Sequence, residues 1–62
     1  MFIEVITRRN EKICLNINEI LNFSPTNNGT LIYMTNEEDF NILENYESFK
    51  ERLKNLKNLQ NV

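Results

Sequence analysis

The stretch TLIYMTNEEDFNILENYESFKERLKNL, residues 30–56, decides the fold, because strand chemistry gives way to helix chemistry within it. From Thr30 to Ile42, the stretch carries β-branched and aromatic residues in alternation, as is typical of paired strands. Beyond Asn45, which suits an N-cap, apolar residues recur at spacings of three and four, and this predicts an amphipathic helix. The apolar stripe consists of Tyr46, Phe49, Leu53, Leu56 and Leu59.

Three further strand-like runs precede this stretch. The first two are joined by a polar hairpin, in which Asn10 is the residue most tolerant of a positive φ. The third ends in a loop, Ser24–Gly29, which holds the only proline and the only glycine. The predicted strands cover residues 2–7, 12–16, 20–24, 30–35 and 39–42, and the helix covers residues 46–59. We expect one α+β domain over residues 1–62: a small antiparallel β-meander, open or curled into a half barrel, with the helix packed on it.

The length and composition bound how this domain is stabilised. With 62 residues, the chain is close to the lower limit for folding alone. It has one cysteine and no histidine, which argues against an internal disulfide and the usual zinc sites. Self-association is the remaining way to add stability, so we expect a homo-oligomer or an obligate complex.

The charge and the opening residues bear on partners and location. A formal net charge of -2 gives no long-range attraction to nucleic acid or anionic membranes. The opening run Met1–Ile6 is too short for a signal peptide or a membrane span, and it carries Glu4. We therefore expect a cytoplasmic protein, in agreement with an unpaired Cys14, with no membrane insertion, no cofactor and no small-molecule substrate.

Several segments in order carry a family resemblance. They are Ile3-Glu4-Val5, Ile13-Cys14-Leu15-Asn16, Ile20 with Phe23, Thr30–Asn36 and Phe40–Asn45. This pattern resembles the FlbD-type flagellar and swarming-motility family of small single-domain proteins. The chain departs from it at Asn10 and Glu37, where the family favours glycine, and at Glu38 and Asp39, which replace lysines. The resemblance implies a fold of this kind and a motility-related role, with a phage or mobile-element role as the alternative.

The helix stripe has two interpretations, since its spacing fits both a core face and a seam between subunits. Leu56 and Leu59 extend beyond what a short sheet covers, so we predict them at an interface. Tyr33 and Phe40, as solvent-facing members of the last hairpin, are the other predicted protein contacts. The leading hypothesis is a non-enzymatic interaction module that self-associates and binds a protein partner.

Two alternative functions use the hairpin tips. Arg8, Arg9 and Lys12 would grip phosphates in a nucleic-acid-binding regulator, with Tyr33 or Phe40 stacking on bases. The simpler explanation is a soluble hairpin, because acidic residues outnumber basic ones. The second alternative is a phage-type inhibitor, whose contacts with a basic site on a host enzyme would be Glu37, Glu38 and Asp39.

Metal and enzyme chemistry find little support. The acidic run 37–39 with Glu44 lacks the alternating ligands and the glycine of a calcium loop, so we expect a solvated hairpin tip rather than a metal site. Cys14 has no histidine to activate it, and we expect a small apolar filler on the second face of the sheet. Since no activated nucleophile or acid–base pair can be assembled, we expect no enzyme.

Overall fold

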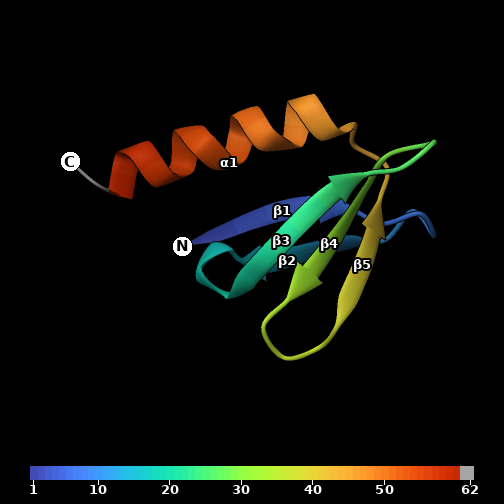
Figure 1. The fold of residues 1–62 in the computed structure, drawn as a ribbon, viewed down its shortest axis with the longest axis horizontal. Coiled ribbons are helices and arrows are strands. Elements are labelled where there is room, and N and C mark those ends of the chain that lie inside the picture. Colours follow the sequence, from blue (N-terminus) through green and yellow to red (C-terminus); the bar gives the residue numbers. More distant parts are fainter. Residues whose placement is uncertain (61–62) are drawn as a thin grey trace.

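The computed structural model describes the backbone of residues 1–60 and the side chains of residues 1–58. Along them run five strands, one 3₁₀ turn and one helix (Figure 1). The elements are β1 (Phe2–Ile6), β2 (Lys12–Asn16), η1 (Ile17–Glu19), β3 (Ile20–Pro25), β4 (Thr30–Met34), β5 (Asp39–Ile42) and α1 (Tyr46–Gln60). The expected α+β class is confirmed, and each predicted element differs from the observed one by at most one residue at either end.

The strands form two antiparallel sheets, where one meander was expected. One sheet pairs β1 with β2, and the other has the order β3-β4-β5. The 3₁₀ turn η1 carries the chain between them. The Asn16 side chain accepts a hydrogen bond from the Asn18 N–H at 3.0 Å, which makes a local turn.

The two sheets meet at one corner. Thr7, just after β1, forms a bridge with Ile42 at the end of β5. Beside this bridge, the Leu43 N–H donates to the Ile6 carbonyl at 2.9 Å. From that corner β1 and β5 run apart, and η1 joins the two sheets again between β2 and β3 (Figure 1).

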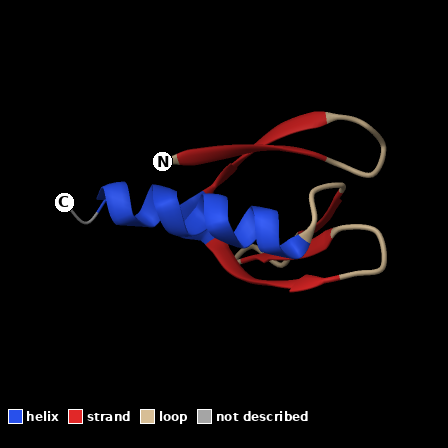
Figure 2. Ribbon diagram, turned by 90° about the horizontal axis from the view of Figure 1, so that it is seen from above, coloured by secondary structure: helices blue, strands red, loops and turns tan. Residues whose placement is uncertain are grey.

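Helix α1 lies over the two sheets, as Figure 2 shows from the helix side. Its side chains Phe49 and Leu53 are buried. The ring of Phe23, from β3, meets the ring of Phe49 edge-on at a centroid distance of 5.2 Å. Burial of side chains of this size contributes about 1.5–3 kcal/mol each. The helix therefore holds the two sheets together.

The core draws on both sheets and on the helix. Its buried members are Ile3, Val5, Leu15, Ile17, Ile32, Met34, Ile42, Phe49 and Leu53. Leu56 packs half-buried against this cluster, which favours the core-face interpretation of the helix stripe at that position. The side chain of Leu59 lies outside the described residues, so its interface role stays a prediction.

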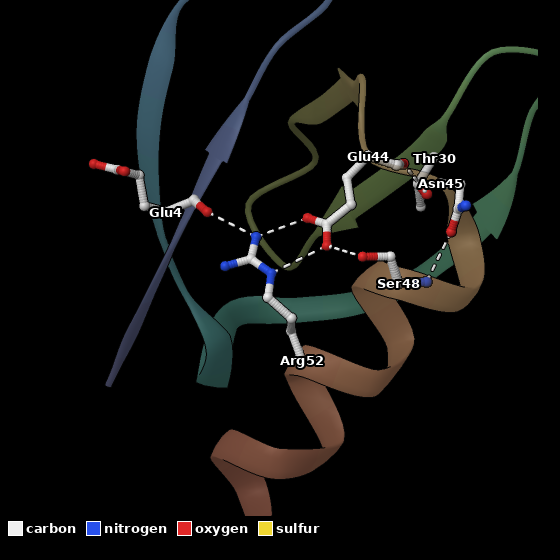
Figure 3. A network of polar contacts seen from close by, with 6 residues as sticks. All are labelled: Glu4, Thr30, Glu44, Asn45, Ser48 and Arg52. Carbon is white, nitrogen blue, oxygen red and sulfur yellow. Dashed lines mark hydrogen bonds and ion pairs between the residues drawn. The ribbon is translucent and has the colours of Figure 1, made fainter.

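The start of α1 is fixed by side-chain hydrogen bonds (Figure 3). The Ser48 N–H donates to the Asn45 Oδ1 at 2.8 Å, which confirms Asn45 as the N-cap. One residue earlier, the Glu44 carbonyl accepts a hydrogen bond at 2.9 Å from the hydroxyl of Thr30, which is fully buried. The loop between β5 and α1 is thereby tied to β4.

Arg52 connects the helix to β1 through a contact that spans most of the chain. Its guanidinium donates to the Glu44 carboxylate at 2.7 and 3.1 Å, and to the Glu4 carbonyl at 2.9 Å (Figure 3). Burial raises the pKa of Glu44, but hydrogen bonds from Arg52 and Ser48, together with the Arg52 charge, outweigh it and hold this pKa below its ordinary value. The hydrogen bond to Glu44 in turn raises the pKa of Arg52.

Candidate protein-binding face

A bulge in β3 creates the most exposed large apolar side chain of the described residues. Ile20 pairs with Met34 and Asn22 pairs with Tyr33, so Leu21 has no partner of its own in the ladder. An extra residue of this kind bends a strand and re-aims a side chain. Leu21 is 66% exposed. The bulge therefore directs a leucine into solvent.

The Leu21 side chain lies next to Tyr33, on the side of the sheet that faces away from the core. Tyr33 is 40% exposed, and the two residues line one hollow of about 430 Å³. Leu31, half-buried, is two residues from Tyr33 along β4 and so shares its face. We name this surface the outer face. Its apolar members are Leu21, Leu31 and Tyr33. Its polar members are the cross-strand partners of Leu31 and Tyr33, namely Asn22, Ser24, Asp39 and Asn41.

The sequence contained a signal for Leu21 that the alternation argument did not use. Ile20, Leu21 and Phe23 form one apolar run within the strand predicted for residues 20–24. In a regular strand, neighbouring residues point to opposite faces, so Ile20 and Phe23 cannot both face the core unless a residue between them is extra. Both do pack against the core. The pattern therefore indicates a bulge, although it does not say which residue is displaced.

The acidic hairpin tip borders the outer face. Glu37 and Glu38 line the same hollow as Tyr33, and Asp39 is the direct cross-strand partner of Tyr33. All three acidic residues are exposed. The tip is an ordered turn, because the Glu38 N–H donates to the Asn36 Oδ1 at 3.1 Å. The structure thus brings the predicted contact Tyr33 together with the predicted acidic contacts.

Phe40 does not join this face, and its expected exposure was wrong. It is paired with the fully buried Ile32 and packs half-buried against the core. The cause is the alternation along β5, which turns Phe40 and Ile42 inward while Asp39 and Asn41 point outward. Tyr33 and Phe40 therefore lie on opposite faces of the same hairpin.

The basic hairpin lines a second hollow, which borders the outer face at Asp39 and Asn41. Arg8 and Arg9 line a hollow of about 410 Å³ together with Phe40, and Glu11 and Asp39 line it too. Of the two aromatic residues considered for stacking, the structure brings Phe40 to the arginines. Lys12 is exposed at the start of β2.

The remaining candidate residues lie apart from the outer face. Cys14 is exposed, so its expected role as a filler was wrong. The neighbours Ile13 and Leu15 take the core side of β2, and the side left to Cys14 faces solvent. Glu44 forms an ion pair with Arg52 just before the helix (Figure 3). Among the described residues, no group of three or more ligand-type side chains is arranged to hold a metal ion.

Comparisons of the chain with protein-family models, with curated proteins and with solved structures found no match. The resemblance to the FlbD-type family therefore stays a prediction from the sequence. Within residues 1–60, no helix has both the length and the apolar character needed to cross a bilayer.

Proposed function

We propose that this chain is a cytoplasmic, non-enzymatic interaction module that binds a protein partner on the outer face. The observation that carries the proposal is the exposed pair of Leu21 and Tyr33, displayed side by side by a β-bulge. Bulges are common next to functional sites, and exposed apolar patches mark interaction surfaces. Neither of these two side chains belongs to the hydrophobic core of the isolated chain.

The composition of the outer face supports the same proposal. Tyrosine is enriched in the centres of protein interfaces, because it offers a large ring together with a polar group. Around Tyr33 and Leu31 lie Asn22, Ser24 and Asn41, which would form the polar rim that such interfaces have.

Other observations bear on the setting of the module. The exposed free thiol of Cys14 suits a reducing compartment such as the cytoplasm. The resemblance to the FlbD-type family supports a motility-related partner. Self-association through the helix has less support, because Leu56 packs against the core.

Site-specific photo-crosslinking in cells tests the proposal. A photoreactive residue would replace Leu21 or Tyr33, and a control would replace Glu51, which is exposed on the helix. We expect adducts of defined mass from positions 21 and 33 and none from position 51. Equal adducts from all three positions, or none from any, would contradict a docking role for the outer face.

The second candidate function is nucleic-acid binding at the basic hairpin. It is favoured by the hollow that Arg8, Arg9 and Phe40 share. It is the weaker candidate, because Glu11 and Asp39 offset the two arginine charges in that hollow. An electrophoretic shift that weakens with salt, and that charge reversal of Arg8, Arg9 and Lys12 abolishes, would establish it in place of the first.

A further inference from the structure

The outer face has one apolar centre and one charged side. Leu21 and Tyr33 form the centre, and the charged side consists of Glu37, Glu38 and Asp39. In the described part of the chain, none of these three carboxylates forms an ion pair. Asp39 also borders the hollow that Arg8 and Arg9 line, whereas Glu37 and Glu38 share the hollow of the Tyr33 ring with no basic residue.

A fourth carboxylate lies at the base of the β4–β5 hairpin. Thr35, which lines the same hollow, donates its hydroxyl hydrogen bond to the Glu19 carboxylate, and its N–H donates to the Glu19 carbonyl at 2.8 Å. These contacts hold Glu19 at the base of the hairpin. Glu19 itself lines a separate hollow together with Glu38 and Phe40, so it does not belong to the outer face.

The backbone at the tip holds one of these carboxylates in an unfavourable conformation. Glu37 has a φ of 70°, in the left-handed region where glycine and asparagine are at home. Strained backbone positions are concentrated at functional sites. A glutamate at this position places a carboxylate at the border of the hollow at some cost to the fold.

We propose, building on the function proposed above, that the partner presents a basic segment to the outer face. The aliphatic stem of a lysine or arginine would pack on Leu21. Its cationic group would lie over the Tyr33 ring and form ion pairs with the carboxylates of Glu37 and Glu38. An adjacent apolar side chain of the same segment would cover Leu31. Charge complementarity thus selects a basic partner over a neutral or acidic one.

A selection from a random-peptide display library separates this inference from the function on which it rests. The wild-type protein would be the target, and Leu21→Ser would be the counter-target, with circular dichroism checking that the variant is folded. We expect enriched peptides that require Leu21 and carry lysine or arginine next to an apolar residue. Enriched peptides that require Leu21 but lack basic residues would overturn this inference and keep the docking function. If no enriched peptide requires Leu21, both fail.

Matched variants then test the charge contribution with one labelled basic peptide from that selection. Glu37→Gln with Glu38→Gln removes two charges at the outer face, and Glu47→Gln with Glu51→Gln removes two on the helix. Because exposed ion pairs are individually weak, we expect the first pair to weaken binding about threefold to tenfold, in fluorescence anisotropy, and the second to leave it unchanged. Equal losses in both would overturn the inference.

The alternative occupant of the outer face is a second copy of this chain, whose Arg8 and Arg9 would supply the basic groups. Sedimentation of the wild-type protein over a dilution series addresses it. We expect the wild-type protein and Leu21→Ser to have the same mass in solution. A concentration-dependent dimer that Leu21→Ser dissociates would show that a second copy covers the face, and the basic partner would be wrong.

Discussion

At the scale of single residues, the two polar hairpins use the same turn with different chemistry. Asn10 and Glu37 both have left-handed φ values, 65° and 70°. Each donates its N–H three residues back, Asn10 to the Thr7 carbonyl at 2.8 Å and Glu37 to the Met34 carbonyl at 3.2 Å. Asparagine tolerates this conformation, whereas an ordinary side chain is strained by it. The first hairpin therefore has a residue that suits the left-handed position, whereas the second has a residue that is strained there.

We predict that Glu37→Gly stabilises the protein by about 1 kcal/mol, because glycine adopts a positive φ without strain. The same change should weaken binding of a basic peptide, since a carboxylate is lost at the outer face. Urea denaturation measures the first effect. Asn10→Gly is the matched control and should change the free energy of unfolding by less. An unchanged or reduced stability of Glu37→Gly would contradict the strain assigned to this residue.

At the scale of elements, one ion pair joins the helix start, the helix body and the edge of β1. Arg52 and Glu44 are 45% and 20% exposed, so water screens part of their attraction. The guanidinium also donates to the Glu4 carbonyl, at the edge of β1 that does not pair with β2. A side chain from the helix thus satisfies the backbone of a strand edge, which would otherwise be open to pairing.

The lowered pKa of Glu44 gives this contact a predictable dependence on pH. A carboxyl whose pKa is lower in the folded state stabilises the fold above its unfolded pKa, about 4.3, and this contribution is lost as the pH falls through the folded pKa. Glu44→Gln should therefore lower the free energy of unfolding by about 0.5–1.5 kcal/mol at pH 7. At a pH below the folded pKa, the wild-type and variant values should converge.

Urea denaturation at a series of pH values provides the measurement for Glu44→Gln. Glu51→Gln is the control, because Glu51 is exposed on the same helix. A gap between wild type and Glu44→Gln that stays constant from neutral to acidic pH would refute an ionised Glu44 as the partner of Arg52.

At the scale of the whole molecule, local patterns in the sequence predicted the elements but not their assembly. Period-two alternation and the N-cap at Asn45 are properties of neighbouring residues, and they gave the element bounds. The division into two sheets and the contact between Arg52 and Glu4 both depend on residues that are far apart in the sequence. The alternation of apolar and polar residues along one strand does not predict such contacts. Gly29 shows the same limit: a Cβ there would lie 2.0 Å from the Ile42 carbonyl oxygen, a close approach that its place in a loop does not reveal.

The candidate site was predictable in part for the same reason. Tyr33 and the acidic tip are adjacent in sequence, and a hairpin necessarily brings them together. Leu21 reaches them only through the bulge in β3, and the exposure of Phe40 depends on which face of β5 the helix and the other sheet cover. The alternation along a strand separates its two faces, but only the assembly of the whole molecule determines which face is buried.

The assembly also predicts different roles for two leucines, Leu56 in the helix and Leu21 in β3. Leu56→Ser should lower the free energy of unfolding by about 1–2 kcal/mol, because this side chain is half-buried against the core. Leu21→Ser should change it by less than about 0.5 kcal/mol, because Leu21 is mostly exposed. Chemical denaturation of the two variants side by side decides this. A larger loss for Leu21→Ser would mean that the outer face serves folding.

The bulge in β3 has a consequence for how this surface is inherited. With Leu21 taken out, Ile20, Asn22 and Phe23 would still meet Met34, Tyr33 and Ile32 in unbroken succession. The extra residue takes no part in the pairing of β3 with β4. Insertion or deletion of a single codon would therefore add or remove the exposed leucine and leave the inward-facing residues in place. Binding to a partner could thus appear or vanish among descendants of one ancestral chain through an insertion or deletion, without any exchange of core side chains.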